Sequence, residues 1–411
     1  MQLQKELFDW VREHAADDPS RLRLAMAGKK GNIDYAAAIT QIECRRKFSA
    51  KLRDTLASFP DFYFPSVLAG EQSTSDLLAE YHASFVPEAL PAVDFTAGLG
   101  IDVFHIASRA SSVTAIELDA SRAEAVVFNA AGLNVDNVEV VTGNCKDYIA
   151  DCVAKGKKFE VGFIDPARRA SDGSRVFALA DCEPDVVTML PELRRICRLL
   201  IIKASPMLDI SHTFEALGQG VIAAIAVGTP TECKELLLVM DFEASDNNKT
   251  LVEAVTLRPQ GSQTFAYTLE EERELPMPGA SGDLKAGDFL YEPSPSLMKS
   301  GAFKVLAKRY ALSVIHPNTR LFYSPRKVDE FPGDVYCVER IFPYASKIIK
   351  RFRREYPRVN VTTRNFGMTG DALRAKLGVS DGGDLRLFAF TDSHGERLMA
   401  LCSKAKNNGT A

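Results

Sequence analysis

Residues 93–118 combine a short apolar strand, a glycine turn, a helix and a second strand with an acid near its end. The turn contains Gly98 and Gly100, and the acid is Glu117, nineteen residues after Gly98. Glycines let a ligand approach the backbone closely, and a carboxylate in this place can accept hydrogen bonds from ribose hydroxyls. The stretch therefore predicts a nucleotide-type site, although a βαβ unit with a glycine turn and no such ligand also fits it.

The glycine spacing argues against a dinucleotide. A dinucleotide fingerprint requires a third glycine three residues after the second, and that position is Val103. Asp94 before the turn, two glycines and an acid that ends the next strand resemble instead a class I S-adenosylmethionine-dependent methyltransferase. The resemblance implies that the turn at Gly98 lies against the methionine part of S-adenosyl-L-methionine. It also implies that Glu117 holds the ribose and that Asp94 helps to orient the methionine end.

Strands and helices alternate after this point. The expected strands are residues 138–141, 159–164, 199–203, 221–227 and 236–241, and the expected helices are residues 120–131, 147–155, 184–196 and 209–217. This alternation predicts an α/β fold, a Rossmann-like methyltransferase domain with a seven-stranded, mostly parallel sheet and helices on both faces. The short link between the last two strands predicts an antiparallel hairpin at the edge of that sheet.

Polar residues follow the carboxyl ends of these strands, where open α/β sheets bind ligands. Asn144 stands where members of the methyltransferase class usually have an acid that accepts from the adenine amine, and its carbonyl oxygen can make the same bond. The residues expected to contact the cofactor are Asp94, Thr96, Gly98, Gly100, Glu117, Asn144, Cys145, Asp165 and Pro166.

Composition limits the remaining possibilities. A chain of 411 residues, 46% of them hydrophobic, is long enough for two or three domains. It has no apolar run of the ~18 residues that a membrane span needs, and its first residues do not resemble a signal peptide. The eight cysteines form no C-x-x-C pair and the six histidines are scattered. We therefore expect a cytoplasmic protein with reduced thiols and no metal.

The net charge of −4 hides an asymmetry. Residues 284–411 hold 22 Lys and Arg against 12 Asp and Glu, a net charge of +10, so residues 1–283 hold 28 against 42, a net charge of −14. The densest basic segment is residues 347–358, where cations alternate with apolar residues as in a helix with one basic face. Such a face predicts contact with a polyanion such as RNA, but a solvated helix face fits the same pattern.

Several strings resemble a bacterial family of S-adenosylmethionine-dependent methyltransferases that carry a ferredoxin-like module and a C-terminal THUMP-like domain. In the catalytic region these are residues 94–100, 165–168, 203–206 and 232–236. Residues 291–293, 301–304 and 316–319 resemble the ferredoxin-like part, and residues 362–366 resemble the THUMP-like part. Because THUMP domains in other enzymes bind RNA, the resemblance implies methylation of tRNA or rRNA.

The expected organisation follows from these segments. It is a helical N-terminal region at 1–88, a methyltransferase domain at 89–245, strands and a linker at 246–280, a ferredoxin-like module at 281–342 and a THUMP-like domain at 343–405.

Three chemistries compete at residues 165–168, Asp-Pro-Ala-Arg. Methylation of pyrimidine carbon-5 needs a cysteine nucleophile after the strand at residues 199–203. Residues 203–206 are Lys-Ala-Ser-Pro, and Cys197 precedes that strand. This chemistry is therefore disfavoured. Methylation of a base nitrogen needs acceptors for the amine, which Asp165 and the Pro166 carbonyl can supply. Ribose 2′-O methylation uses a Lys-Asp-Lys-Glu set, three members of which correspond to Asp165, Lys203 and Glu235. We favour the base nitrogen slightly over the ribose.

The candidate catalytic residues are therefore Asp165, Lys203 and Glu235, although a structural ion pair of Lys203 with either acid is an equal alternative. The candidate substrate-binding residues are Arg168, Arg169, Lys350, Arg351 and Arg354. Two further functions stay open. The chain can be an RNA-binding protein that keeps the cofactor pocket without catalysis, or a small-molecule methyltransferase whose added domains mediate dimerisation.

Overall fold

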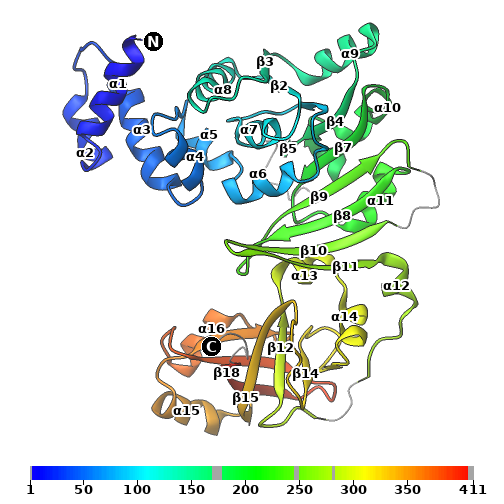
Figure 1. Cartoon of the computed structure of the whole chain (residues 1–411). Helices are drawn as coiled ribbons and strands as arrows, with labels where there is room; N and C mark the ends of the chain where they lie inside the picture. Colours follow the sequence, from blue (N-terminus) through cyan, green and yellow to red (C-terminus); the bar gives the residue numbers. More distant parts are fainter. Residues whose placement is uncertain (1, 169–177, 245–249, 280–282, 406–411) are drawn as a thin grey trace. The chain divides into compact units, whose positions relative to one another are not determined.

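The computed structural model describes residues 2–168, 178–244, 250–279 and 283–405. Two compact units are present: residues 1–222 with 237–248, and residues 223–236 with 249–411. Figure 1 shows the order of the helices and strands along the chain.

The first unit begins with short helices. These are α1 (Gln2–Glu13), α2 (Pro19–Met26), α3 (Tyr35–Phe48), α4 (Arg53–Ser58), α5 (Val67–Gln72) and α6 (Asp76–Ala83). The sequence predicts one helix over residues 35–56, but the structure interrupts it after Phe48. The reason is a distant contact, because Asp76 Oδ2 accepts hydrogen bonds from the backbone N–H groups of Asp54 and Thr55, at 2.8 and 3.0 Å, and so caps α4.

A parallel sheet follows in the same unit. Its strands are β1 (Pro91–Asp94), β2 (Ser112–Glu117), β3 (Val138–Thr142), β4 (Phe159–Ile164) and β7 (Cys197–Ala204), in the order β7-β4-β1-β2-β3. The intervening helices are α7 (Ile101–Ala107), α8 (Ala120–Gly132), α9 (Cys145–Lys155), α10 (Val186–Ile196) and α11 (Ile210–Leu217). This arrangement confirms the predicted α/β fold. Since all five strands are parallel, their carboxyl ends meet at one edge.

Strands β8 (Val221–Gly228) and β9 (Cys233–Asp241) form the predicted antiparallel hairpin. At the turn, the Thr229 N–H donates to the Glu232 carbonyl at 2.9 Å, and at the open end the Asp241 N–H donates to the Gly220 carbonyl at 2.9 Å. Between β4 and α10 lie β5 (Ala167–Arg168), a 3₁₀ turn at Leu179–Asp181 and β6 (Cys182–Glu183), and β5 pairs antiparallel with β6.

The core of the first unit joins the sheet to the N-terminal helices. Apolar residues of β1, α7 and β2 pack in one buried cluster with Phe62 and Phe64, which lie between α4 and α5. Phe62 and Phe64 are fully buried. The helical region therefore shares a hydrophobic core with the sheet instead of forming a separate body.

The second unit contains two sets of strands. In the first set, β8 pairs in parallel with β10 (Leu251–Arg258), β10 pairs antiparallel with β11 (Gly261–Thr268), and α12 (Leu269–Glu274) follows. The second set is a sheet in the order β13-β14-β12-β15-β18-β17-β16. Its strands are β12 (Phe289–Pro293), β13 (Ser313–Val314), β14 (Phe322–Ser324), β15 (Gly333–Pro343), β16 (Asn360–Arg364), β17 (Leu385–Thr391) and β18 (Arg397–Lys404).

The helices that follow α12 in the second unit are α13 (Pro295–Ser300), α14 (Phe303–Arg309), α15 (Ser346–Glu355) and α16 (Gly370–Leu377). Successive residues of β17 enter two different cores, as the period of two in a strand requires. Leu387 and Ala389 pack with residues of α15 and α16. Phe388 and Phe390 pack on the other face with residues such as Tyr336. Helices α15 and α16 thus cover one face of this sheet.

Candidate active site

The glycine turn between β1 and α7 adopts the conformation that its sequence requires. Gly98 and Gly100 have φ angles of +57° and +86°, values that favour glycine. A side chain at Gly100 would also lie 2.8 Å from the ring of Phe104, whereas at Gly98 the nearest atom would be 3.9 Å away. Open space therefore lies beside Gly98, while Gly100 is needed for packing as well as for its backbone angle.

Glu117 holds this turn in place. Its carboxylate accepts a hydrogen bond from the Gly98 N–H at 2.7 Å and one from the Asp119 N–H at 2.8 Å. A carboxylate has about four acceptor sites, and these two bonds use one on each oxygen. Glu117 is buried at 7% exposure. The side chain is thus fixed at the end of β2.

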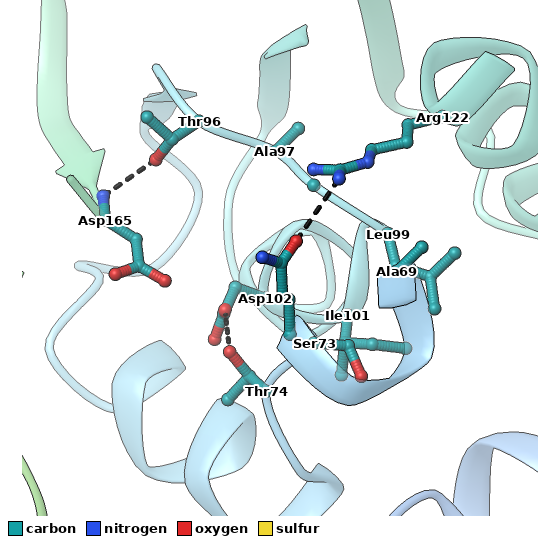
Figure 2. Close-up of a pocket in the computed structure, with 12 residues that line it drawn as sticks. Ala69, Ser73, Thr74, Thr96, Ala97, Leu99, Ile101, Asp102, Arg122 and Asp165 are labelled. Atoms are coloured by element: carbon teal, nitrogen blue, oxygen red, sulfur yellow. Dashed lines mark hydrogen bonds between the residues drawn. The ribbon is translucent and has the colours of Figure 1, made fainter. Parts of the chain in front are cut away.

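Asp94 and Thr96 connect the ends of β1 and β4. Asp94 is buried, and its Oδ1 accepts from the Thr96 N–H at 2.8 Å. Thr96 Oγ1 in turn accepts from the Asp165 N–H at 2.7 Å, as Figure 2 shows. Burial raises the pKa of Asp94 to about 8, although the Thr96 N–H opposes the shift. Burial therefore favours the protonated form of Asp94, whose carboxyl group fixes the turn through Thr96.

Asp165 and Lys203 form an ion pair at the ends of β4 and β7. Lys203 Nζ lies 2.6 Å from Asp165 Oδ2, with side-chain exposures of 14% and 37% respectively. Lys203 Nζ also donates to Thr74 Oγ1 at 3.1 Å. Because β4 and β7 are adjacent and parallel, the residues that follow them lie side by side. The structure therefore brings together two of the three predicted catalytic residues.

A buried polar chain continues from Thr74, and the sequence does not predict it. Thr74 Oγ1 donates to Asp102 Oδ2 at 2.5 Å, and His82 Nδ1 lies 2.7 Å from Asp102 Oδ1. His82 is fully buried. Burial acts to raise the pKa of Asp102, but the charge and hydrogen bond of His82, together with Lys203 and Thr74, outweigh it and lower that pKa to about 2. Asp102 is therefore a buried carboxylate held ionised next to the ion pair.

These groups line or adjoin one small cavity (Figure 2). Its walls come from the segment that joins α5 to α6, from the glycine turn and from the end of β4. The lining residues are Ala69, Gln72, Ser73, Thr74, Thr96, Ala97, Gly98, Leu99, Ile101, Asp102, Arg122 and Asp165. Arg122 Nη2 donates to Gln72 Oε1 at 3.2 Å, so a contact between the helical region and α8 crosses this cavity.

The other predicted cofactor residues lie near the ends of β3 and β4. Asn144 is exposed and caps α9, because its Oδ1 accepts from the Lys146 N–H at 2.9 Å. Cys145 is buried, and burial raises the pKa of its thiol. Pro166 is buried after Asp165. A role of Asn144 or Cys145 in adenine binding stays a prediction, and neither residue lines the cavity at Gly98.

Three further predicted residues are Arg168, Arg169 and Glu235. The backbone of Arg168 lies in β5, and Arg169 lies outside the described residues. Glu235 is buried at 3% exposure on β9, in the part of that strand that belongs to the second unit. The roles proposed for these residues stay predictions.

A solved structure resembles this arrangement over its whole length. The crystal structure of a putative methyltransferase from Porphyromonas gingivalis W83 matches with a TM-score of 0.87, at 31% sequence identity and over 98% of each chain. The chain belongs to this methyltransferase family. Its predicted accessory domains are also found: a model described as a ferredoxin-like domain matches residues 289–332, and one described as THUMP domain-like matches residues 333–404.

A curated relative matches a shorter part of the methyltransferase. It is an uncharacterized RNA methyltransferase from Clostridium tetani (strain Massachusetts / E88), 29% identical over 94 residues. The match covers 23% of this chain and 20% of the relative's length. The name of this relative agrees with the methyltransferase family and specifies RNA as its substrate.

Helix α15 lies in the THUMP-like part of the methyltransferase. Phe352 is buried and packs with Ile348 and Ile349 in the cluster that α15 shares with α16. Lys350, Arg351 and Arg354 are exposed, with Lys347 and Arg353. Within the range 283–405, these five cations make no ion pair. The predicted apolar seam and basic face are both present.

A second cationic cluster, in the N-terminal region, has a structural explanation. Arg45 donates to the carbonyls of Pro60 and Phe62 and lies over the ring of Phe8 at 5.2 Å. Burial lowers the pKa of Arg45 to about 10. Lys47 pairs with Glu71. The sequence also predicts a second basic face here, formed by Arg45, Arg46, Lys47 and Lys51. Arg45 and Lys47 make contacts within their own unit, whereas Arg46 and Lys47 are exposed, and the basic face stays a prediction.

Two findings concern what the described residues do not contain. The parts of the chain outside the gaps at 169–177, 245–249 and 280–282 hold no cluster of three or more His, Cys, Asp or Glu that could bind a metal ion. Among the described helices, none is long and apolar enough to cross a membrane. None of the eight cysteines, all of which are described, forms a disulfide.

Proposed function

We propose that this protein is an S-adenosyl-L-methionine-dependent methyltransferase that methylates a base nitrogen of RNA. The observation that carries the proposal is the Asp165–Lys203 ion pair at the carboxyl ends of β4 and β7. The Asp165 carboxylate accepts from Lys203, and the Asp165 backbone N–H donates to the Thr96 hydroxyl. A carboxylate held in this way at a nucleotide-type site is arranged to accept hydrogen bonds from a substrate.

The residues around the glycine turn fit the cofactor. The open space beside Gly98 leaves room for a ligand against the backbone, and Glu117 is fixed by two backbone N–H groups with acceptor sites left for ribose hydroxyls. Thr96, whose N–H donates to Asp94, sets the position of Asp165 through its hydroxyl. When bound, the cofactor supplies an electrophilic methyl group on a sulfonium. Asn144 and Cys145 are the candidates for adenine contacts.

We assign to Asp165 the role of accepting hydrogen bonds from the target amine of the RNA base. Its carboxylate and the Pro166 carbonyl accept the amine hydrogens, which orients the nitrogen lone pair for attack on the methyl carbon. A carbon–nitrogen bond forms as the carbon–sulfur bond breaks, and the proton lost by the nitrogen passes to the Asp165 carboxylate or to water. Lys203, at 2.6 Å, keeps the carboxylate oriented.

The substrate class is inferred from the C-terminal half. The THUMP-like match, the exposed basic face of α15 and the net charge of +10 over residues 284–411 all favour a polyanion. If the substrate were a small molecule, the exposed basic face of α15 would have no role in binding it. We therefore infer an RNA substrate, in the cytoplasm, where free thiols are kept reduced.

Ribose 2′-O methylation is the second candidate, because Lys203 and Asp165 are paired as two members of a Lys-Asp-Lys-Glu set would be. Methylation of pyrimidine carbon-5 has no support in the geometry. Cys197 begins β7 beside Phe159, whereas Ile202 pairs with Ile164. Cys197 therefore lies at the opposite end of the strand from Lys203, and its pKa is raised by burial, so it is no thiolate nucleophile.

One experiment tests the proposal. The protein is incubated with methyl-labelled S-adenosyl-L-methionine and total RNA, and the digested nucleosides are analysed by mass. Label on a base nitrogen is the expected result, and label on a ribose oxygen selects the second candidate. If calorimetry detects binding of the cofactor but no RNA, and no small molecule of a cell extract, becomes labelled, the protein is a binding module and the catalytic proposal is wrong.

A further inference from the structure

The second unit contains a cavity with three arginines that the methyl-transfer site does not use. Arg258 at the end of β10, Arg364 at the end of β16 and Arg386 on β17 line it. The other lining residues are Pro230, Thr231, Thr256, Glu292, Pro293, Ser294, Pro295, Met298, Gly333 and Asp334. Arg364 belongs to a string that resembles the THUMP-like domain, and Glu292 belongs to one that resembles the ferredoxin-like module.

Glu292 holds two of these arginines together. Its Oε1 accepts from Arg364 Nη2 at 2.8 Å, and its Oε2 accepts from Arg386 Nη1 at 3.1 Å. The Glu292 side chain is only 12% exposed. Two guanidinium groups side by side would repel each other, and one carboxylate between them removes that cost. The pairing leaves further donors on each guanidinium, since arginine has five N–H groups.

Both guanidinium groups are oriented before any ligand arrives. In the parallel register of β16 and β17, Arg364 lies opposite Phe390 and Asn360 lies opposite Arg386, so the two arginines point to the same face of the sheet. Arg386 also lies over the rings of Tyr336 and Phe388, at 5.5 and 5.9 Å from their centroids. A fork that is already fixed loses little side-chain entropy when it binds an anion.

Two observations indicate that N–H donors of Arg364 and Arg258 remain available for a ligand. Arg364 Nε is buried and has no hydrogen-bond partner among the residues described. A buried N–H without a partner is costly, and a ligand oxygen next to this side chain would satisfy it. Arg258 is exposed and forms no ion pair with any residue in the described ranges. Thr231, Thr256 and Ser294 add hydroxyl groups to the lining.

The cavity is distinct from the basic face of α15. Arg386 lies on the face of β17 that carries Phe388 and Phe390, whereas α15 packs with Leu387 and Ala389 on the other face. The charges of the lining residues sum to +1, from three arginines against Glu292 and Asp334. Asp334 is further neutralised by Lys404 at 3.0 Å. The cavity therefore favours an anion although the whole chain is acidic.

We propose that this cavity binds a phosphate group of the RNA substrate, with Arg258, Arg364 and Arg386 as the donors. Planar guanidinium forks match the oxygens of phosphate bidentately, and hydroxyl groups commonly add phosphate contacts. This inference rests on the proposed function for the identity of the polymer. A neighbouring cavity shares Arg258, Gly333 and Asp334 with this one, so the two cavities adjoin at these residues.

The test measures binding of one 12-nucleotide RNA by fluorescence anisotropy, without cofactor, in three forms: with a 5′-phosphate, with a 3′-phosphate and with hydroxyl ends. The variants are Arg258→Gln and Arg386→Gln, and the second leaves Glu292 paired with Arg364. Each is expected to weaken binding about tenfold, which is the loss of roughly one charged hydrogen bond. Arg273→Gln, an exposed arginine of α12 outside both cavities, is the matched control and is expected to bind like the wild type.

The three RNAs identify the source of the phosphate. A preference of the wild type for one phosphorylated end, lost in the variants, assigns a terminal phosphate. Equal binding of all three RNAs, weakened equally in the variants, assigns an internal phosphodiester. Wild-type affinity of both variants for all three RNAs overturns the inference and leaves the proposed function intact. If the wild type binds none of them, the inference fails together with the RNA part of the proposed function, and the labelling experiment decides whether catalysis remains.

Discussion

Lys203 Nζ lies 2.6 Å from Asp165 Oδ2, although the two residues are 38 positions apart and stand at the ends of different strands. The pair exists because β4 and β7 are parallel neighbours that end at the same edge of the sheet. It sets the orientation of the carboxylate that we assign to the substrate amine, and the first prediction tests that assignment.

Asp165→Ala is expected to abolish methyl transfer, by a factor of about 10² to 10⁴, because the amine loses its acceptor. Cofactor affinity, measured by calorimetry, is expected to stay within a few-fold of the wild type, since the ribose is assigned to Glu117. Full turnover by this variant would contradict the role of Asp165. Asp185→Ala, which removes the N-cap of α10, is the control for a general loss of stability.

Thr74→Val tests the buried chain behind the ion pair. The Thr74 hydroxyl donates to Asp102 and accepts from Lys203, so valine removes both bonds at nearly constant volume. We expect kcat to fall about tenfold, which corresponds to roughly 1.5 kcal/mol, with KM for RNA unchanged. Thr74→Ser keeps the hydroxyl and is expected to restore kcat. A purely structural role would lower the melting temperature of the valine variant while leaving kcat at the wild-type value.

Asp94→Asn tests the protonated state of the buried acid. The folded-state pKa of Asp94, about 8, lies above the value near 3.8 of an unperturbed aspartate. Its contribution to stability is therefore complete below pH ~3.8 and is lost as the pH rises toward 8, by up to about 1.4 kcal/mol per pH unit. Urea unfolding of the wild type and of the variant between pH 5 and 8 measures the difference. A constant difference across this range would show that Asp94 does not titrate there.

Gly98→Ala and Gly100→Ala separate backbone strain from packing. Alanine at either position adopts a positive φ at a cost of roughly 1–2 kcal/mol. At Gly100 the new methyl also meets Phe104 at 2.8 Å, so this variant is expected to unfold at lower urea concentration than Gly98→Ala. Gly98→Ala is expected to weaken cofactor binding more than its loss of stability explains, because the methyl enters the open space of the site. If Gly98→Ala binds the cofactor with wild-type affinity, the cofactor does not occupy the open space beside Gly98.

Lys350→Glu/Arg351→Glu tests the basic face of α15. Each lost phosphate contact is expected to reduce the slope of log affinity against log salt by about 0.9 for a duplex and about 0.7 for a single strand. Because Phe352, Ile348 and Ile349 anchor the helix, the variant is expected to keep its melting temperature. Lys308→Glu, an exposed lysine of α14, is the control. If the slope of log RNA affinity against log salt is unchanged in the variant, the basic face of α15 does not contact RNA and is only solvated.

Much of the fold is local and could be predicted from the sequence. The parallel strands of the first unit and the hairpin β8–β9 follow from apolar runs, from glycine turns and from the short link between the last two strands. The break between α3 and α4 was missed, because the acid that caps α4, Asp76, lies more than twenty residues away. Candidate site residues such as Asp165 were found because they follow strand ends, where ligands bind.

The amino-acid sequence by itself determined the α/β architecture, the glycine turn and the residues at the carboxyl edge of the sheet, since each depends on neighbours within a few positions. Only the tertiary structure decided which polar groups meet. Lys203 reaches Thr74 across 129 positions, and Glu292 joins Arg364 and Arg386 across 72 and 94 positions. Such contacts are set by the packing of whole elements, and no local pattern of residues encodes them.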